Sequence, residues 1–399
     1  MISHLGPGIS RRRVLTTAAA GGAVASLGLP PPRALAGAPA ILKALPPDLF
    51  VDFGTNAEMR WDAVDPRRYL TPASRLFVRN HTATPVLDRD RYELRIFGDG
   101  LAGGRSAAEP LRFSLRDLKR LPTTRLTAVH ECTGNGRSFF ATQQGRAASG
   151  TAWRLGSVGT VEWEGVRLRT LLRRIGLRRD AVSVQATGLD APYVAGGVDH
   201  GRVRRPFPVT KALDDALLAW GANGAPLLPD HGFPLRLVLP GWVGIASIKW
   251  LGSLEVSRSE LTSPWNTTWY RLTGGDHPPG SPPLTVNPVR SAWELPWEAP
   301  LRAGRPVTLT GRSWSGAAPI RAVEVSLDGG ASWRAAELGE REGLGWTTWS
   351  VRWHRPRPGR HELLARATDR HGRTQPDVAA YNDNGYFFDA VVRHPVVVA

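Results

Sequence analysis

The sequence predicts an α+β protein in which a mixed α+β domain precedes an immunoglobulin-like β-sandwich. Three observations support this fold class. Residues 75–240 alternate short helical and strand patterns with irregular loops rich in Gly and Pro. The stretch Thr273–Pro283, TGGDHPPGSPP, has the composition of a linker or a long crossing loop. Beyond it, strand patterns recur at close spacing over roughly a hundred residues, as in β-sandwiches.

Turn and cap signals define the elements of the first region. Strands are expected at Leu76–Val78, Tyr92–Phe97, Arg125–His130, Val182–Ala186 and Leu235–Val238. A short helix is expected over Ser114–Arg120, because Ser114 suits the N-cap and Asp117 stands at the capping-box position. Two further helices are expected over Arg169–Ile175, which Gly176 closes, and over Thr210–Ala216. Short elements of both kinds favour an α+β domain over a doubly wound sheet.

Alternating or continuous apolar runs predict the strands of the second region. They are Val307–Leu309, Ile320–Leu327, Trp346–Trp353, Glu362–Thr368 and Ala390–Val398. The turn Asp328-Gly329-Gly330 separates two of them. Most of the 15 Trp residues fall at strand or loop positions, where core packing explains them. The expected domains are therefore residues 37–270, mixed α+β, and residues 271–399, the β-sandwich.

Residues 1–36 have the pattern of a twin-arginine export signal. Three arginines stand in Ser10–Leu15 (SRRRVL), a mild apolar run follows over Thr16–Pro30, and Ala34-Leu35-Ala36 is an A-x-A cleavage signal. Three glycines interrupt the apolar run, which makes it a poor membrane anchor. This route generally exports folded proteins, often with a cofactor installed. The sequence therefore predicts a cofactor-loaded protein of the periplasm or another extracytoplasmic space.

The chain is strongly basic, with a formal net charge of +16, of which about +12 remains once the four arginines of residues 1–36 are removed. Nucleic acid is the usual partner of so basic a protein, but export argues against it. The excess arginine is spread along the chain. Its densest cluster is most simply a solvated face beside a helix and comprises Arg167, Arg169, Arg173, Arg174, Arg178 and Arg179. Capture of a small anionic substrate by the positive field stays open.

The stretch Thr127–Phe140, TAVHECTGNGRSFF, holds Cys132, the only cysteine of the chain. A single cysteine cannot form an internal disulfide, and an exposed free thiol outside the cytosol is open to oxidation. Two interpretations remain. Cys132 is a small buried core residue, as most lone cysteines are, or it is permanently bonded to a metal.

Polar side chains gather in three other short motifs. They are LFVRNH (Leu76–His81), DHGFPLR (Asp230–Arg236) and GIASIKW (Gly244–Trp250). Strand alternation sends Arg79 and His81 to one face and Asn80 to the other. Each motif by itself has a structural explanation, such as pairing with neighbours at a strand end. Taken with Cys132 and Arg137, they suit a soft metal, a phosphorylated cofactor and an oxyanion substrate.

Common cofactor motifs are absent from the sequence. No second cysteine, CxxC, HxxxH or HExxH grouping supplies the ligands of a zinc site. P-loop, GxSxG and CxxCH patterns are missing as well. A cofactor that needs one protein thiolate is a molybdenum centre whose other sulfur ligands come from its own pterin.

At this point the chain resembles the sulfite oxidase family of molybdopterin enzymes. The resemblance rests on LFVRNH, HECTGNGR, SIKWL and the long, specific motif NGAPLLPDHGFPLRLVLPGWVG, and it runs from about Arg75 to the C-terminus. It implies a molybdopterin-binding α+β domain followed by a dimerisation domain, hence a homodimer. The chain has no room for the N-terminal haem domain of the animal enzymes, so the bacterial, stand-alone type is expected.

The resemblance also implies roles for individual residues. Cys132 matches the thiolate ligand of molybdenum, and Arg79 and Arg137 match the arginines that hold the oxyanion. His81 belongs to the same first motif. Trp153 matches a tryptophan of the pocket wall, and Tyr270 an active-site tyrosine, although Trp269 replaces the acidic residue usual before it. The residues expected to contact the pterin and its phosphate are Asn80, Asp190, His231, Arg236, Ser247, the backbone of Ile248, and Lys249.

One departure from the family concerns the substrate. Near the C-terminus the family often carries an Arg-Gly pair with a further substrate arginine, but here the segment Asn382–Tyr386 reads NDNGY. The function that the resemblance implies is oxidation of sulfite to sulfate, with electrons passed to a separate acceptor such as a cytochrome c. Loss of a cation leaves open another sulfur oxyanion, or reduction of an S- or N-oxide. A binding or adhesion protein that uses the β-sandwich is a third hypothesis, and it would tolerate Cys132→Ser.

Overall fold

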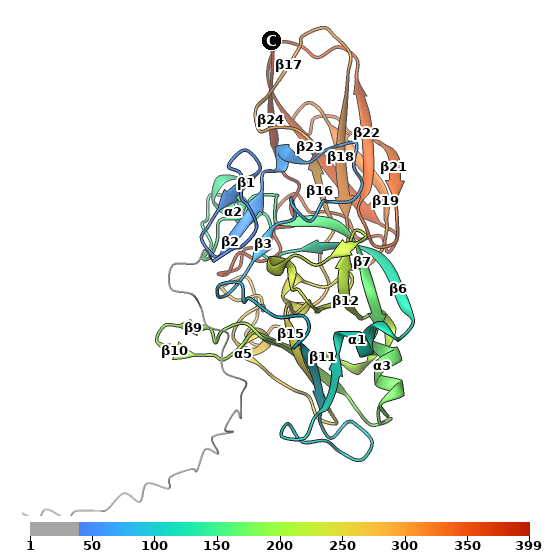
Figure 1. Cartoon of the computed structure of the whole chain (residues 1–399). Coiled ribbons are helices and arrows are strands. Elements are labelled where there is room, and N and C mark those ends of the chain that lie inside the picture. Colours follow the sequence, from blue (N-terminus) through green and yellow to red (C-terminus); the bar gives the residue numbers. More distant parts are fainter. Residues whose placement is uncertain (1–39) are drawn as a thin grey trace, which may run out of the picture. The chain divides into compact units, whose positions relative to one another are not determined.

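A computed structural model describes residues 40–399 of the chain, and the predicted export signal lies outside the described residues. Figure 1 shows the two predicted regions, with the strands of the second region coloured brown to red. None of the helices in residues 40–399 is long and apolar enough to cross a membrane. The fold class is as predicted, a mixed α+β part followed by a β-sandwich.

A five-stranded mixed sheet with the order β11-β8-β15-β4-β5 forms one half of the first part. Its strands are β4 (Glu93–Phe97), β5 (Leu111–Ser114), β8 (Ser183–Gly188), β11 (Arg204–Pro208) and β15 (Leu251–Ser257). β15 and β4 run parallel, whereas the other neighbours are antiparallel. The predicted strands at β4 and β8 are confirmed, with ends that differ by one or two residues.

A second sheet delivers the cysteine. Its order is β13-β12-β7-β6, with β14 paired to β12. The strands are β6 (Thr123–Glu131), β7 (Val158–Arg167), β12 (Leu217–Ala222), β13 (Ala225–Pro226) and β14 (Arg236–Val238). β6 pairs with β7 along its whole length, from Thr123 to Glu131, so the strand ends directly before Cys132. The sequence prediction found β6 and β14 but not β7 and β12, whose continuous burial removes the period-two signal.

Two small strand groups flank these sheets. β1 (Phe50–Asp52), β2 (Asn56–Met59) and β3 (Val78–Arg79) form one, and the hairpin β9 (Val194–Ala195) with β10 (Val198–Asp199) forms the other. The prediction of a strand over Leu76–Val78 is wrong in its bounds. Pairing with β2 begins only at Val78, because Leu76 closes a turn with Pro72. The hairpin stands away from the sheets in Figure 1.

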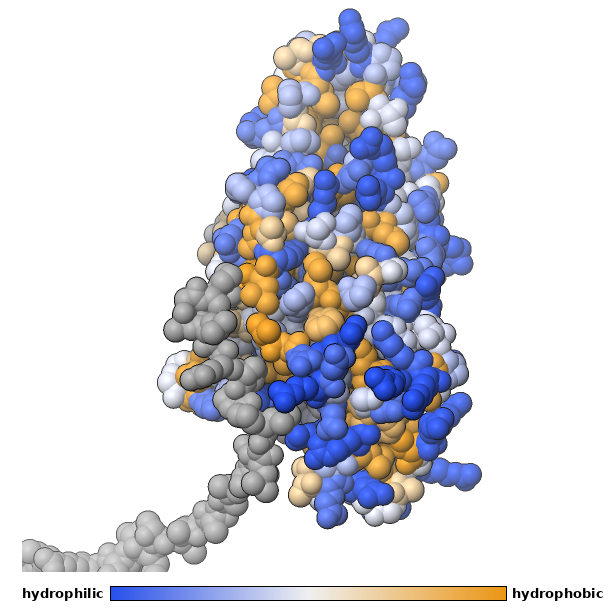
Figure 2. Space-filling model, viewed as in Figure 1, coloured by the Kyte–Doolittle hydropathy of each residue, from blue (hydrophilic) through white to orange (hydrophobic). Residues whose placement is uncertain are grey.

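The helices are short, and their ends follow the sequence. They are α1 (Leu115–Lys119), α2 (Ser138–Thr142), α3 (Leu168–Arg174), α4 (Val209–Asp214), α5 (Pro264–Thr267) and the 3-10 turns η1 (Trp61–Ala63), η2 (Pro229–His231) and η3 (Gly244–Ala246). The predicted capping box of α1 forms between Ser114 and Asp117. The arginines around α3 are exposed or half-buried, as predicted. Figure 2 shows hydrophilic side chains over the surface where α3 lies.

The second part is the predicted sandwich of two sheets, with orders β16-β18-β22-β21 and β17-β24-β23-β19-β20. Its strands are β16 (Arg290–Trp293), β17 (Ala299–Leu301), β18 (Val307–Trp314), β19 (Ile320–Ser326), β20 (Arg334–Ala335), β21 (Glu337–Arg341), β22 (Thr347–Trp353), β23 (Gly359–Asp369) and β24 (His394–Val398). Each predicted strand exists. Three bounds were wrong, since β18 is longer than Val307–Leu309, β23 begins at Gly359 and not at Glu362, and β24 begins at His394 and not at Ala390.

A buried tryptophan cluster joins the N-terminal segment to the sandwich. The ring centroid of Trp61 lies 6.1 Å from that of Trp314 and 6.5 Å from that of Trp346. Its indole N–H donates to the carbonyl of Trp293 at 2.7 Å. These contacts confirm the prediction that tryptophans serve the core.

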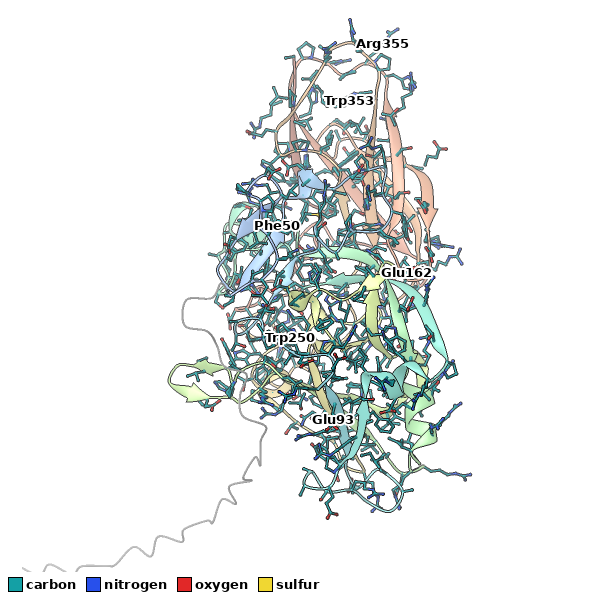
Figure 3. All side chains as sticks on the ribbon, viewed as in Figure 1. Phe50, Glu93, Glu162, Trp250, Trp353 and Arg355 are labelled. Atoms are coloured by element: carbon teal, nitrogen blue, oxygen red, sulfur yellow. The ribbon has the colours of Figure 1, made fainter. Side chains whose placement is uncertain are left out.

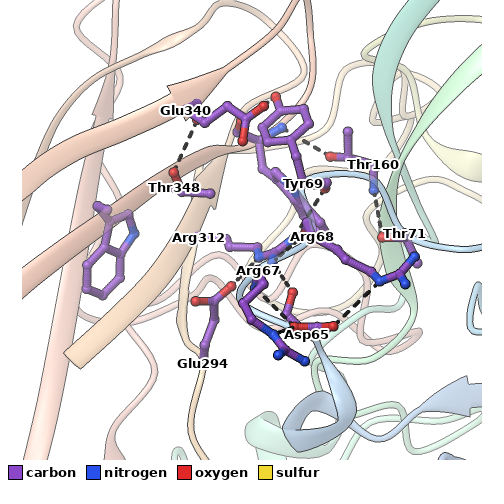
Figure 4. Close-up of polar contacts among 12 residues, drawn as sticks. Asp65, Arg67, Arg68, Tyr69, Thr71, Thr160, Glu294, Arg312, Glu340 and Thr348 are labelled. Carbon is purple, nitrogen blue, oxygen red and sulfur yellow. Dashed lines mark hydrogen bonds and ion pairs between the residues drawn. The ribbon is translucent and has the colours of Figure 1, made fainter. Parts of the chain in front are cut away.

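A second attachment surrounds the buried Arg312 guanidinium, drawn in Figure 4. It pairs with the buried carboxylate of Glu294 and donates to the carbonyls of Asp65, Arg68 and Tyr69. These bonds fix the chain segment before β3 to the sandwich, so that the sandwich lies beside the site described next.

Candidate active site

Two cavities meet at Cys132. The inner one encloses about 700 Å³ and the outer one about 990 Å³, counting space that opens to solvent. Both are lined by Arg79, Asn80, His81, Cys132 and Tyr270. The inner cavity lies deep in the first part, and Figure 3 shows Trp250, one of its walls, among packed side chains. Cys132 thus belongs to a cavity wall although only 8% of its surface is exposed.

A tight turn presents the cysteine at this junction. The Cys132 N–H donates to the carbonyl of Ser157 at 2.9 Å, and its carbonyl accepts from Asn135 N–H at 2.9 Å. Gly244 packs against the same backbone, where a Cβ would lie 2.6 Å from the Glu131 carbonyl oxygen. Burial raises the pKa of the Cys132 thiol, while nearby Arg79 opposes the rise. The structure combines features of both sequence interpretations of Cys132. The thiol is buried, but it still faces open space between the two cavities.

The carboxylate of Glu131 anchors the cysteine turn from behind. It accepts from Asn135 Nδ2 at 2.9 Å, from Trp314 Nε1 at 2.9 Å and from Arg290 Nη1 at 3.2 Å. Glu131 and Arg290 are both buried, with side chains 1% and 4% exposed. Arg290 and Trp314 belong to the sandwich, so the second part of the chain holds the residue next to Cys132.

The first motif brings Arg79 and His81 together, but not by strand alternation, because β3 ends at Arg79 and Asn80 lines the same two cavities. Arg79 Nη2 lies 3.2 Å from His81 Nε2, and Trp265 Nε1 donates to the same nitrogen at 3.0 Å. Both neighbours can only donate, so Nε2 is the unprotonated nitrogen and Nδ1 carries the proton. Burial, followed by Arg79 and Lys249, lowers the pKa of His81 well below its ordinary value. His81 is therefore a neutral hydrogen-bond donor, which makes it unsuited to acid–base work near neutral pH.

The guanidinium of Arg137 is held in a groove made by three glycines. Cβ atoms added at Gly134, Gly150 and Gly385 would lie 2.5, 2.9 and 2.6 Å from atoms of Arg137. Arg137 Nε donates to the Asn384 carbonyl at 2.8 Å, and Nη1 donates to the Thr151 carbonyl at 2.8 Å. Burial lowers the pKa of Arg137, an indication that the cation lacks a compensating charge.

Aromatic side chains form much of the outer wall. Tyr270 and Tyr386 stack at 5.1 Å with an angle of 11° between their planes. Arg137 lies 5.5 Å from the centroid of the Tyr386 ring. Burial raises the pKa of both tyrosines, so their hydroxyls stay neutral donors. Trp153, predicted as a pocket tryptophan, lines the outer cavity together with Arg137.

Cations crowd the inner cavity. Arg236 donates through Nη1 to the His231 carbonyl at 3.1 Å and through Nη2 to the Ser247 carbonyl at 3.0 Å. Lys249 pairs with Asn80 Oδ1 and donates to the Asp230 carbonyl at 2.8 Å. Burial lowers the pKa of Arg236 to about 9 and that of Lys249 well below its ordinary value.

These donors fit a phosphorylated pterin. Four buried polar atoms of the inner cavity lining lack a partner within the described residues, namely Thr133 Oγ1, Asp190 Oδ1, His231 Nε2 and Arg236 Nε. A bound phosphate would compensate the buried cations and restore their pKa values. A pterin ring supplies both donors and acceptors for His231 and Asp190. The donor set therefore matches the cofactor that the sequence predicts.

Every predicted site residue lies at one or both cavities. The residues confined to the inner cavity are Asp190, His231, Arg236, Ser247, Ile248 and Lys249, all of them predicted cofactor contacts. Ile248 lines this cavity, and its carbonyl accepts from Leu237 N–H at 2.8 Å. The individual roles remain predictions, and the two groups of residues are separated only in part, since Arg79, His81 and Tyr270 line the inner cavity as well as the outer one.

Sequence reasoning missed several residues of the site. His130 lines the inner cavity, with Nε2 3.2 Å from Arg236 Nη2, and Asp230 binds the backbone N–H groups of Leu42 and Lys43. Tyr193 meets the His81 ring edge-on at 5.1 Å. His130 and Asp230 stand inside the quoted motifs, so their position was a usable signal. Tyr386 ends the segment NDNGY quoted above, whereas Tyr193 offered no signal, because only the fold brings it to the cavity.

Comparisons with known proteins agree with this architecture. The family model described as "Oxidoreductase molybdopterin binding domain" matches residues 81–265, and "Mo-co oxidoreductase dimerisation domain" matches residues 288–397. Mitochondrial sulfite oxidase of Rattus norvegicus is 35% identical over 78% of this chain, which spans 58% of that enzyme's length. Sulfite oxidase of Gallus gallus is 33% identical, with 78% of this chain and 69% of that protein covered.

A solved structure is similar as well. The sulfane dehydrogenase SoxCD of Paracoccus pantotrophus matches with a TM-score of 0.72 and 29% identity, covering 84% of this chain and 82% of that chain. Together, the matches confirm the predicted order of a molybdopterin-binding domain and a dimerisation domain, and with it the molybdenum–molybdopterin cofactor.

Proposed function

The chain belongs to the sulfite oxidase family of molybdopterin oxidoreductases, and from this premise we propose that it oxidises sulfite to sulfate outside the cytoplasm. Electrons pass to a separate one-electron acceptor of the cytochrome c type. The observation that carries the proposal is the position of Cys132, between a cavity rich in buried cations and a cavity that presents two arginines. The twin-arginine pattern of residues 1–36 supports export, and the matched dimerisation domain supports a homodimer.

The inner cavity and Cys132 hold the cofactor in this proposal. Arg236, Lys249 and Ser247 bind the phosphate, His231 and Asp190 contact the pterin, and the Cys132 thiolate is the protein ligand of the metal. When bound, this group supplies a two-electron oxidant and the oxygen atom that sulfite acquires. The buried position of the thiol keeps it from solvent and from other oxidants.

The outer cavity binds and orients the substrate. Arg79 and Arg137 neutralise the oxyanion with guanidinium groups that are already fixed by hydrogen bonds, so little ordering remains to be done on binding. Tyr270 adds a neutral O–H donor between the two cavities. His81 stays unprotonated at Nε2 and holds the Arg79 side chain.

The experiment that tests the proposal combines metal analysis with turnover. Protein produced in a host that makes the cofactor should contain about one molybdenum per chain, as expected for one thiolate site. It should reduce cytochrome c in the presence of sulfite and release sulfate. Molybdenum-loaded protein without sulfite turnover would contradict the proposed substrate, and folded protein without molybdenum would contradict the cofactor site.

A second candidate is another sulfur substrate, or reduction of an S- or N-oxide. It is favoured by Asn384-Gly385-Tyr386, where the family often carries Arg-Gly, and by the similarity to a sulfane dehydrogenase. Loss of one cation weakens binding of a dianion more than that of a monoanion. The two fixed arginines nevertheless favour an anion over a neutral oxide.

We expect Gly385→Ala to lower kcat/KM for sulfite by about tenfold to a hundredfold, because a small displacement of a positioning group has effects of this size. The new Cβ would lie 2.6 Å from Arg137 Cγ and 2.7 Å from Ala148 Cβ, so the arginine must move. Steady-state kinetics measure the effect. Gly329→Ala is the matched control, since Gly329 also has a positive φ, +73° against +56°, but no heavy atom within 4 Å of the added Cβ. Wild-type kinetics in Gly385→Ala would contradict the role given to Arg137.

A further inference from the structure

The outer cavity is built for more than an inorganic oxyanion. Its charged lining consists of Arg79 and Arg137, and none of its described lining residues carries a carboxylate. Five aromatic side chains share the wall, namely Trp153, Tyr193, Trp269, Tyr270 and Tyr386. Sulfite has no carbon to place against such a surface. The combination of two cations with the half-buried rings of Tyr193 and Trp269 suits an anion that carries an apolar group.

The hydrogen bonds that Arg79 and Arg137 make within the protein leave each guanidinium with donors for about two oxygens of a ligand. Arg137 uses Nε and Nη1 for backbone carbonyls, and Arg79 uses Nη1 for the Asn80 carbonyl and Nη2 for His81. A guanidinium has five N–H donors in a fixed plane, so both groups keep donors but in restricted directions. The pair can therefore bind an anion with two oxygens as well as one with three.

The aromatic side chains form two groups on the outer wall. Tyr386 stacks on Tyr270 and lies beside Arg137. Tyr193 lies 5.6 Å from Trp269 and 5.1 Å from His81, and both Tyr193 and Trp269 are half-buried. Ring surface that remains accessible at a cavity gains from contact with an apolar or aromatic ligand group.

We propose that the site also oxidises organic sulfinates, R–SO2−, in which R is an aromatic or alkyl group, to the sulfonates R–SO3−. This inference rests on the proposed oxygen-atom transfer at sulfur. A sulfinate keeps the sulfur lone pair of sulfite and two of its oxygens, and replaces the third oxygen with carbon. The two oxygens bind Arg79 and Arg137, and the group R packs on Trp269 and Tyr193.

The reaction balances with the acceptor already named. One S–O bond forms at the sulfur lone pair, and the R–S bond stays intact. Sulfinate and water give sulfonate, two protons and two electrons, and the electrons reduce two equivalents of a cytochrome c-type acceptor. Water is the final source of the oxygen.

The test compares sulfite, methanesulfinate and benzenesulfinate on molybdenum-loaded protein. Acceptor reduction is followed, and oxygen from labelled water is sought in the sulfonate by mass spectrometry. We expect kcat/KM for benzenesulfinate to exceed that for methanesulfinate by about tenfold, the upper size of one aromatic contact. Trp269→Ala should bring this ratio close to one. Trp297→Ala, which removes an exposed tryptophan outside the lining of both cavities, should leave the ratio as in the wild type.

Binding gives a readout that does not depend on turnover. Quenching of tryptophan fluorescence should show benzenesulfonate binding about tenfold more tightly than sulfate, again the size of one aromatic contact. Equal affinities would overturn the inference. Turnover of sulfite without either sulfinate would also overturn it and leave the proposed function standing. Turnover of sulfinates without sulfite would support it and contradict the proposed substrate, and turnover of none would overturn both.

Discussion

Cys132→Ser is expected to leave the protein folded and to lower sulfite-dependent cytochrome c reduction by at least about a hundredfold. Loss of a residue that only orients a metal ligand costs tenfold to a hundredfold, so loss of the ligand itself should cost at least as much. Serine keeps the size of the side chain, but its hydroxyl does not ionise to a soft anionic ligand at neutral pH. Kinetics, molybdenum content and the loss of sulfur-to-metal charge-transfer absorption measure the effect.

The competing interpretation of Cys132 as a core residue predicts a different pattern. Cys132 packs with Leu76, Phe77 and Trp153 in a buried cluster, so a purely structural cysteine would lower stability when changed and leave turnover largely intact. Cys132→Ala separates the two effects, because it removes the ligand without placing a hydroxyl in the cluster. A serine variant that binds molybdenum and keeps more than about a tenth of the activity would contradict the ligand role, since loss of a metal ligand should lower the activity by more than about tenfold.

Arg290→Met is expected to lower the free energy of unfolding by about 3–5 kcal/mol, the usual cost of removing one partner from a buried ion pair. The change leaves Glu131 buried without its cation, and Asn135 and Trp314 remain as its donors. Urea unfolding monitored by tryptophan fluorescence measures the loss. The double variant Arg290→Met with Glu131→Gln should recover much of it, because no charge then remains buried.

The loss in Arg290→Met should depend on pH. Burial raises the pKa of Glu131, and Arg290 is the leading group that opposes the rise, so the pKa climbs further in the variant. Between the ordinary glutamate pKa and this raised value, the folded state binds more protons than the unfolded state. The free energy of unfolding therefore increases as pH falls, and the deficit should shrink as the pH is lowered from neutral toward the ordinary glutamate pKa.

An exposed pair provides the control for this prediction. Arg360 and Glu298 lie 2.6 Å apart with side chains 63% and 50% exposed. Arg360→Met should change the free energy of unfolding by less than about 1 kcal/mol, as is typical of surface pairs. Two outcomes would contradict the role given to the buried Glu131 carboxylate. One is a similar loss of unfolding free energy in Arg290→Met and Arg360→Met, and the other is a loss in Arg290→Met that grows at low pH.

The sequence by itself determined the fold class, and its resemblance to the sulfite oxidase family supplied the cofactor and most of the residues that line the cavities. The patterns and motifs behind both are short-range information. The capping box at Ser114 and Asp117, the period of β4 and the grouping of donors in LFVRNH and SIKWL each lie within a few residues. Cys132 was recognisable because it is the only thiol and stands at the end of a strand. Individual strand ends were less certain, as at β3 and β24, because tertiary pairing sets them.

Only the tertiary structure decided how these residues work together. Glu131 and Arg290 are 159 residues apart, and Arg137 and Asn384 are 247 residues apart. No local period or motif relates such pairs, because their contact depends on how the sandwich packs beside β6. The proton position on His81 likewise depends on Trp265, which is 184 residues away. The stacking between Tyr386 and Tyr270 depends on the position of a loop that follows β23. Local sequence specifies which groups are present, whereas long-range packing specifies their distances and protonation, on which the chemistry depends.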